Sequence, residues 1–196
     1  MSNKIISHIS IIMDGNGRWA NQKNMPRAYG HKEGVKAIDK IVSACSIRQI
    51  SQLSLFALSS ENLNRPDYEV QFLLKLFEDS INKYINDLHS NNARIKFIGN
   101  LELFSPRLLK TISKAEKVTK DNTGLKLNFA INYGGQWDIV NAVNNMIGDT
   151  DFPSKIKKFS VEDLEKYLSL EGSSPDLLIR TAGEQRLSNF MLWQHA

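Results

Sequence analysis

Short apolar runs alternate along this chain with longer segments whose apolar residues recur at helical spacing. This alternation constrains the fold more than any single motif, because it is typical of an α/β domain with a largely parallel sheet. The runs that we predict to be strands are residues 9–13, 53–58, 94–98, 125–131 and 177–179. No Pro/Gly/Ser-rich linker and no internal repeat divides the 196 residues, so we expect one domain.

Between these runs, apolar side chains spaced three and four residues apart predict helices. The expected helices are Glu33–Ile47, Asp67–Leu88, Pro106–Asp121, Asp138–Ile147 and a short one that begins near Ser160. Ser105 is a plausible N-cap, and "SVED" at Ser160 resembles a capping box. The only cysteine, Cys45, falls on the apolar side of its helix, which favours a packed thiol over a disulfide or a metal ligand.

Four polar clusters each follow a predicted strand. They read "DGNGR", "SSENLNR", "NYGG" and "RTAGEQR". In an open parallel sheet the carboxyl ends of the strands lie along one edge, where ligands bind. We therefore expect the four loops to converge on a single site.

Arginine is concentrated in and beside these loops, whereas lysine dominates the helices. Five of the eight arginines are placed there: Arg18, Arg27, Arg65, Arg180 and Arg186. The planar guanidinium suits bidentate contact with phosphate, which a solvated helix face does not require. The net charge of +4 fits an anionic ligand or a membrane surface. Nucleic acid is a weak option, because no basic run with interleaved aromatic residues occurs.

An aspartate, Asp14, directly precedes the glycine turn "GNGRWA". Beside a diphosphate this carboxylate would be repelled unless a cation lay between them, and Mg²⁺ is usually held by one or two carboxylates plus phosphate oxygens. Gly15, Asn16 and Gly17 either supply backbone donors to an anion or form a tight turn. His31 either donates to phosphate or is a helix cap or a surface residue. As a dinucleotide fingerprint G-x-G-x-x-A is weak, because Pro26 soon interrupts the helix that it would open, and no P-loop motif occurs.

Five blocks together carry a family resemblance from His8 to the end of the chain. They are "HISIIMDGNGRWA", "RAYGHKEG", "SSENLNRP", "LNFAINYGGQWDIV" and "IRTAGEQRLSNFMLWQ". In this order and spacing, the chain resembles the cis-prenyltransferase family, most closely the bacterial undecaprenyl diphosphate synthases. The resemblance implies a single α/β domain with a mostly parallel central sheet flanked by helices. No D-D-x-x-D pair occurs, so the all-helical trans-prenyltransferases do not fit.

The resemblance implies Mg²⁺-dependent condensation of isopentenyl diphosphate with farnesyl diphosphate. The product would be a long Z-polyprenyl diphosphate such as undecaprenyl diphosphate, the precursor of the lipid carrier for cell-wall peptidoglycan. A cytoplasmic homodimer is implied, with transient membrane contact for product release. The segment "MSNKIISHISIIMD" is too short for a membrane span and poor as a signal peptide, which agrees with that location. The Asp67–Leu88 helix and the strands around Leu55 and Leu125 are candidate walls for the product tail.

Site roles carry over to the positions that match the family motifs. Asp14 is expected to bind Mg²⁺ and promote departure of the allylic diphosphate, and Asn62 is expected to assist proton removal. The residues expected to hold the allylic substrate are Gly15, Asn16, Gly17, Arg18, Arg27 and His31, with Trp19 beside them. Isopentenyl diphosphate is expected at Arg180, Arg186 and Ser188. The mobile loop that closes over the site is expected to contain Ser59, Ser60, Glu61, Leu63 and Arg65.

Three departures from the family pattern leave alternatives open. Leu63 replaces the usual loop aromatic, and Ala182 stands where the family usually has a glycine. The sequence ends at "LWQHA", whereas the family normally continues through a segment with a second metal-binding glutamate and residues of the dimer interface. We therefore also consider a non-catalytic diphosphate-binding or dimer-partner protein. A dinucleotide oxidoreductase, which rests on the glycine turn alone, is a third hypothesis.

Overall fold

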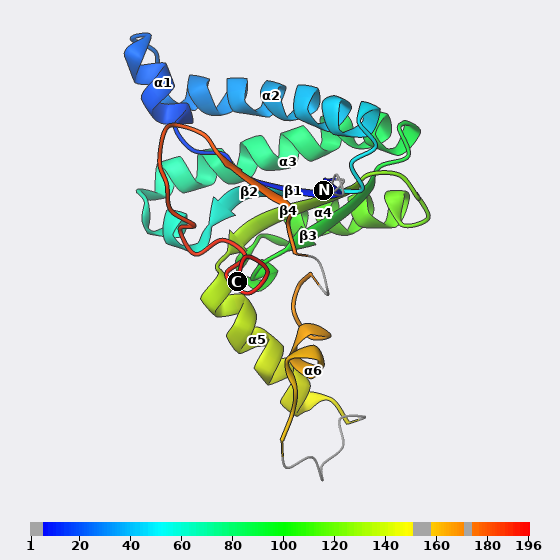
Figure 1. The fold of residues 1–196 in the computed structure, drawn as a ribbon. Helices are drawn as coiled ribbons and strands as arrows, with labels where there is room; N and C mark the ends of the chain where they lie inside the picture. The colour runs from blue at the N-terminus through cyan, green and yellow to red at the C-terminus, as the bar shows by residue number, and fades with distance from the viewer. Residues whose placement is uncertain (1–5, 151–157, 171–173) are drawn as a thin grey trace, which may run out of the picture.

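The computed structural model describes residues 6–150, 158–170 and 174–196. Its centre is a sheet of five strands in the order β3-β4-β2-β1-β5, and every neighbouring pair is parallel (Figure 1). The strands are β1 (His8–Ile12), β2 (Gln52–Ser59), β3 (Arg94–Ile98), β4 (Lys126–Tyr133) and β5 (Leu177–Arg180). All five predicted strands are present, which confirms the predicted α/β class with a parallel sheet.

Helices connect the strands and cover both faces of the sheet. They are α1 (Asn16–Gln22), α2 (Arg27–Ile47), α3 (Asp67–Ser90), α4 (Pro106–Thr119), α5 (Gly135–Gly148) and α6 (Val161–Glu165), with the 3-10 helices η1 (Ser60–Asn64) and η2 (Leu101–Leu103). The predicted N-caps are confirmed: the Ser105 hydroxyl accepts from the Leu108 N–H at 3.3 Å, and Ser160 forms a capping box with Asp163.

The sequence-based prediction was wrong about the region between β1 and α2. The glycine turn opens a short helix, α1, that was not predicted, and α2 begins at Arg27 rather than at Glu33. Pro26 has the φ of −58° that its ring enforces and precedes the first turn of α2, so the proline ends one helical stretch and starts the next. Gly30 lies within α2, where the absence of a side chain lets α1 pack closely, because a Cβ there would overlap the Asn16 carbonyl.

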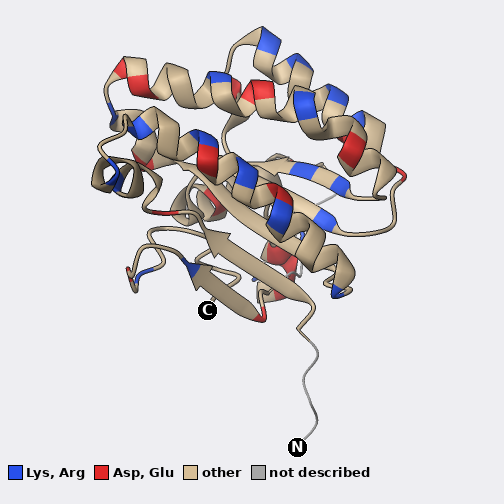
Figure 2. Ribbon diagram, turned by 90° about the horizontal axis from the view of Figure 1, so that it is seen from above, with Lys and Arg blue, Asp and Glu red and all other residues tan. Residues whose placement is uncertain are grey.

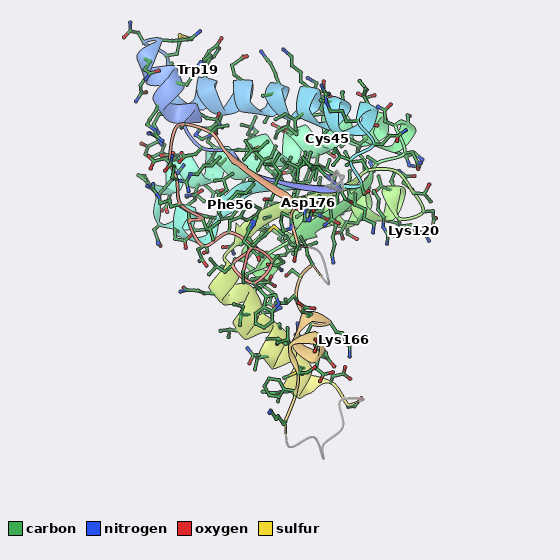
Figure 3. The ribbon with its side chains drawn as sticks, viewed as in Figure 1. Trp19, Cys45, Phe56, Lys120, Lys166 and Asp176 are labelled. Carbon is green, nitrogen blue, oxygen red and sulfur yellow. The ribbon has the colours of Figure 1, made fainter. Side chains whose placement is uncertain are left out.

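The register of the strands divides the core into two layers. Ile9, Leu53, Leu127 and Ile95 are paired across the sheet, so their side chains share one face, which α2, α3 and α4 cover. Cys45 of α2 is buried in this layer, as predicted, and Figure 3 shows it between α2 and the sheet.

The opposite face of the sheet carries a separate aromatic cluster. Phe56 of β2 stacks on Phe190 with ring centroids 4.4 Å apart, and Tyr133 of β4 meets both rings edge-on. α5 and the chain after β5 lie on this side (Figure 1). The last described segment is therefore packed against the sheet through a buried side chain and is not a loose tail.

Basic and acidic residues alternate along two of the covering helices. Seen from above, α2 and α3 carry interspersed basic and acidic residues along their exposed surfaces (Figure 2). Within the described ranges, no helix is long and apolar enough to cross a membrane. Residues 1–5, which belong to the N-terminal segment discussed above, lie outside the described residues.

Candidate functional site

Of the four loops predicted to converge, those after three parallel strands meet at one edge of the sheet, whereas "NYGG" after β4 does not line the cleft that they form. In Figure 1 they gather beside α1: the turn after β1, η1 after β2, and the orange-to-red segment after β5. They enclose an open cleft of about 660 Å³. The predicted site residues that line it are Asp14, Gly15, Asn16, Gly17, Arg18, Arg27, His31, Ser59, Glu61, Asn62, Arg65, Arg180, Arg186 and Ser188.

Three predicted site residues do not line this cleft. The Trp19 ring is 37% exposed and stacks on Tyr29 at 6.0 Å on the outer side of α1, where Figure 3 shows it at the edge of the molecule. Leu63 is half-buried in η1, and the Ser60 hydroxyl packs against Gly134. Their substrate-binding roles stay predictions.

Asp14 is held in place by bonds to both carboxylate oxygens. The Gly15 N–H donates to Oδ1 at 2.7 Å, and Arg180 donates from Nη2 to Oδ2 at 2.8 Å, while Arg18 lies 3.6 Å from Oδ2. Partial burial opposes ionisation, but the Arg180 and Gly15 hydrogen bonds outweigh it and lower the pKa of Asp14 below its ordinary value. The carboxylate is therefore charged at neutral pH and faces the cleft.

Glycine is required at position 15 for two reasons. Its φ is +88°, a left-handed conformation that other residues adopt at a cost of about 1–2 kcal/mol. In addition, a Cβ there would overlap the methyl group of Ala182 in the loop after β5. The turn after β1 and the loop after β5 are thus in close contact, and the Thr181 hydroxyl donates to the Asp14 carbonyl at 2.5 Å.

Two arginines on one side of the cleft share a carboxylate that the sequence analysis missed. Arg27 at the start of α2 and Arg65 after η1 both donate to Oε1 of Glu69, at 3.3 and 3.0 Å. The Glu69 side chain is only 14% exposed, so it fixes both guanidinium groups at the cleft wall. Sequence offered one signal for it, an acidic residue in the first turn of α3, but that position is equally explained by the helix dipole.

His31 lies behind these arginines with a buried, unpartnered ring nitrogen. Nε2 has no hydrogen-bond partner among the described groups. Burial and the nearby charges of Arg65 and Arg27 lower the pKa of His31 below its ordinary value of 6.5, despite an opposing effect from Glu69. The ring is therefore neutral at pH 7, and its free nitrogen can donate to a ligand oxygen if it carries the proton.

This lowered pKa gives a testable dependence of stability on pH. As the pH falls below about 6.5, the unfolded chain binds a proton at His31 before the folded chain does, so the free energy of unfolding decreases. His31→Gln removes this contribution, and the variant should lose less stability than the parent between pH 7.5 and pH 5.5. Urea unfolding at both pH values measures the difference; equal losses in the two proteins would contradict a depressed pKa.

Arg180 organises the other side of the cleft. Besides Asp14, it donates from Nη1 to the Arg186 carbonyl at 2.5 Å and to the Ser188 hydroxyl at 2.7 Å. Its side chain is 9% exposed, and its Nε has no partner within the described structure. One buried guanidinium therefore shapes the loop after β5 and keeps a donor for a ligand. Arg186 is more exposed and pairs with Glu184, which also lies 3.3 Å from Arg18.

Asn62 lies in a turn held by two reciprocal hydrogen bonds with Ser59. In η1 the Ser59 hydroxyl accepts from the Asn62 N–H at 3.2 Å, and the Asn62 side-chain oxygen accepts from the Ser59 N–H at 3.3 Å. This reciprocal capping box orients the amide of Asn62 at the cleft. The predicted polar loop is thus a structured 3-10 turn.

An apolar cavity adjoins the polar cleft and extends beneath α2 and α3. Its volume is about 130 Å³, and Met13, Asn16 and His31 border both spaces. The α3 wall was predicted. The strand wall consists of Ala57, Leu58, Ile95, Phe97, Leu127, Phe129 and Ile131. It includes the predicted strands β2 and β4, though not Leu55 or Leu125 themselves, while the contributions of α2 and β3 were not predicted.

The acidic side chains of the cleft do not form a preassembled metal cluster. Asp14 and Glu61 are the carboxylates that line it. Across the described residues, no group of three or more His, Cys, Asp or Glu side chains could hold a metal ion. A single carboxylate is nevertheless compatible with Mg²⁺ when phosphate oxygens and water complete the coordination.

Comparison with known proteins gives consistent matches over nearly the whole chain. The family model described as "putative undecaprenyl diphosphate synthase" matches residues 12–196. An isoprenyl transferase of Neisseria meningitidis is 45% identical over 98% of this chain and 76% of its own length. A (2E,6E)-farnesyl-diphosphate-specific ditrans,polycis-undecaprenyl-diphosphate synthase of Coxiella burnetii is 47% identical over 96% of this chain and 81% of its own.

Solved structures with the same fold include two related enzymes. The lavandulyl diphosphate synthase of Lavandula x intermedia, solved in complex with dimethylallyl diphosphate, has a TM-score of 0.91 and 34% identity over 97% of this chain and 83% of its own. A probable undecaprenyl diphosphate synthase from Campylobacter jejuni has a TM-score of 0.80 and 32% identity over 98% of this chain and 82% of its own.

Proposed function

This chain belongs to the undecaprenyl diphosphate synthase family and is a prenyltransferase, and from that premise we propose its substrates and the roles of its residues. It adds isopentenyl diphosphate units to farnesyl diphosphate and makes a long Z-polyprenyl diphosphate such as undecaprenyl diphosphate. One observation carries the proposal: arginines from three separate loops line a polar cleft that continues into an apolar cavity. A diphosphate with a hydrocarbon tail needs both.

The allylic diphosphate binds on the side of the cleft formed by Arg27, Arg65 and His31. Two fixed guanidinium groups provide charge and directed donors, and the unpartnered His31 nitrogen adds a further donor. Gly15 and Gly17 supply backbone N–H groups at the cleft, and a Cβ at Gly17 would lie 2.9 Å from the Arg27 guanidinium carbon. The hydrocarbon tail then enters the apolar cavity through the shared border.

Isopentenyl diphosphate binds on the opposite side, at Arg180, Arg186 and Ser188. These groups are already linked by the hydrogen bonds of Arg180, which leave its Nε for a phosphate oxygen. Asn62 faces the cleft from η1 and assists removal of the proton that the condensation releases. No covalent enzyme nucleophile is required for this chemistry.

Asp14 is the residue that would hold Mg²⁺. Its carboxylate is ionised, lines the cleft between the two arginine-rich sides, and fits the usual demand of Mg²⁺ for one or two carboxylates plus phosphate oxygens. Bound there, the metal ion would neutralise charge on the departing diphosphate. Asp14 itself orients the adjoining loop through its bonds to Gly15 and Arg180.

The apolar cavity must expand as the product grows. Its 130 Å³ compares with the roughly 150 Å³ of a cavity that holds one benzene molecule, so a long prenyl chain requires α2 and α3 to separate. The cavity thus provides the path for the tail, and its lining limits product length.

Narrowing this path should shorten the product. Ser80 of α3 lines the cavity about 16 Å along the helix from Glu69, and its hydroxyl donates to the Leu76 carbonyl at 2.6 Å. Ser80→Phe should shift the product distribution toward shorter chains while initial condensation continues. Ser43→Phe is the matched control, because Ser43 donates to its own i−4 carbonyl at 3.0 Å on an exposed part of α2. Chain-length separation of labelled products gives the readout; unchanged lengths in Ser80→Phe would contradict this path.

We also propose a homodimer and a brief contact with a membrane surface. β5 is an edge strand, and its Ile179 is 40% exposed, while Val140 and Ile147 of α5 are 60% and 75% exposed. Burying these side chains against a second copy would remove apolar area from water. Sedimentation equilibrium tests the dimer, and vesicle flotation tests the membrane contact.

The decisive experiment combines the chain with farnesyl diphosphate, radiolabelled isopentenyl diphosphate and Mg²⁺, with and without chelator. A chelator-sensitive ladder of long prenyl diphosphates supports the proposal. Absence of product from folded protein that still binds diphosphate would favour the non-catalytic alternative. Saturable NAD(P)H fluorescence change without a response to isopentenyl diphosphate would instead support the oxidoreductase hypothesis.

A further inference from the structure

Asn189, in the segment after β5, forms hydrogen bonds with η1 and with the start of α5. Its side-chain Nδ2 donates to Glu61 Oε1 at 2.9 Å, its Oδ1 accepts from the Gln136 N–H at 2.9 Å, and its carbonyl accepts from the Gly135 N–H at 2.6 Å. The residue therefore caps the first turn of α5 and, at the same time, holds η1.

The surrounding backbone is built to accept this asparagine. Asn189 has a φ of +62°, a left-handed conformation in which asparagine is enriched. A Cβ on Gly134 would lie 2.7 Å from Asn189 Nδ2 and 2.9 Å from the Ser60 hydroxyl. A Cβ on Gly135 would lie 2.8 Å from the Leu192 backbone nitrogen. The two glycines of "NYGG" thus allow the segment after β5 to pack closely against the backbone, and we assign them no direct contact with phosphate.

We propose that Asn189 is a positioning residue that couples η1 to the loop after β5. Ser188, which precedes it, accepts from Arg180, and Glu61, which it holds, precedes Asn62. A single side chain thereby sets the distance between the group proposed to assist proton removal and the groups proposed to bind isopentenyl diphosphate. This inference rests on the proposed function for its kinetic consequences, but the coupling itself rests on the contacts alone.

Asn189→Asp isolates the contact with Glu61 from the cap on α5. The aspartate keeps an oxygen for the Gln136 N–H, so the α5 cap survives, but it places a carboxylate against that of Glu61. We expect kcat to fall about tenfold and the KM for isopentenyl diphosphate to rise, with the KM for farnesyl diphosphate little changed. Adding Glu61→Gln should recover much of the loss, because the glutamine amide can donate to the introduced carboxylate and restore the bond in the reverse direction.

Asn92→Asp is the matched control. Asn92 lies just before the outer strand β3, and it also has a left-handed φ, of +57°. Its side chain bonds Thr123 through both Nδ2 and Oδ1. The control should leave both KM values and kcat unchanged. Amide hydrogen exchange over residues 60–64 provides a readout that needs no turnover: exchange should accelerate in Asn189→Asp, return toward the parent rate in the double variant, and stay unchanged in Asn92→Asp.

The outcomes separate the coupling from the proposed reaction. If Asn189→Asp leaves exchange in η1 and the kinetic constants unchanged, the contact with Glu61 does not position η1 and the proposal is wrong, whatever happens to the melting temperature. Failure of the double variant to recover either exchange or activity would also overturn it. If the parent chain makes no product, the proposed function fails, while the exchange measurements still decide whether Asn189 holds η1.

Discussion

Asp14→Ala should abolish formation of prenyl product while leaving the chain folded. Asp14 is charged, lines the cleft and is the carboxylate that we propose to hold Mg²⁺. Its removal also leaves Arg180 without the partner at 2.8 Å that helps to fix its guanidinium group. Loss of one preorganised electrostatic contact at a reacting centre typically lowers rates 10²- to 10³-fold, and loss of the metal site adds to this. We expect a decrease of about 10³-fold or more in kcat.

Asp14→Asn separates charge from geometry. The amide oxygen can still accept the Gly15 N–H, so the turn should keep its shape, but the negative charge is lost. This variant should be nearly as inactive as Asp14→Ala and more stable to urea. Calorimetric titration of Mg²⁺ with a non-hydrolysable diphosphate provides a second readout, in which both variants should lose the metal-dependent part of binding. Turnover within tenfold of the parent in either variant would remove the role assigned to Asp14.

Strand positions and the convergence of loops were predictable because both follow from local patterns. The strand predicted at 94–98 matches β3 residue for residue, and Ser105 caps α4 as predicted. Once the sheet was expected to be parallel, topology alone placed Asp14 and Arg180 at the same edge. The spacing of apolar residues, every second residue in a strand and every 3.6 residues in a helix, indicates the type of element within a single segment.

Contacts between segments were not predictable from such patterns. Glu69 is one residue in the first turn of a long helix, and only the folded structure shows that it binds both Arg27 and Arg65. The "NYGG" motif was expected to contribute to the site, whereas its glycines are required by the close approach of Asn189 to Gly134 and of Leu192 to Gly135. Tertiary packing decides these cases, and a local sequence window does not contain the partner.

Ala182 shows how a departure from the family pattern can be tolerated. Its φ is +71°, a conformation in which alanine is disfavoured by roughly 1–2 kcal/mol relative to the ordinary helical region. The loop nevertheless keeps this conformation, because Thr181 donates to the Asp14 carbonyl and Arg180 holds the Arg186 carbonyl. Several hydrogen bonds on both sides of one strained residue therefore maintain the geometry.

Arg180→Ala should raise the KM for isopentenyl diphosphate about 100-fold, with a much smaller effect on the KM for farnesyl diphosphate. The buried guanidinium bonds Asp14, the Arg186 carbonyl and the Ser188 hydroxyl at once, so its loss both removes a ligand for diphosphate and releases the loop. The Arg186 side chain is exposed and pairs with Glu184, so Arg186→Ala should raise the same KM less, about tenfold. Each tenfold change corresponds to about 1.4 kcal/mol.

Arg180→Lys and a remote control distinguish geometry from charge. A lysine keeps the positive charge but cannot direct donors to three acceptors as the planar guanidinium does, so Arg180→Lys should recover only part of the affinity. Arg107→Ala removes an arginine that is 81% exposed and pairs with Glu78 at 2.6 Å outside the cleft, and neither KM should change. Steady-state kinetics with each substrate varied in turn measures both constants. If Arg180→Ala weakened farnesyl diphosphate as much as isopentenyl diphosphate, the two sides of the cleft would not be separate subsites, because the arginines would then act only through a shared positive field.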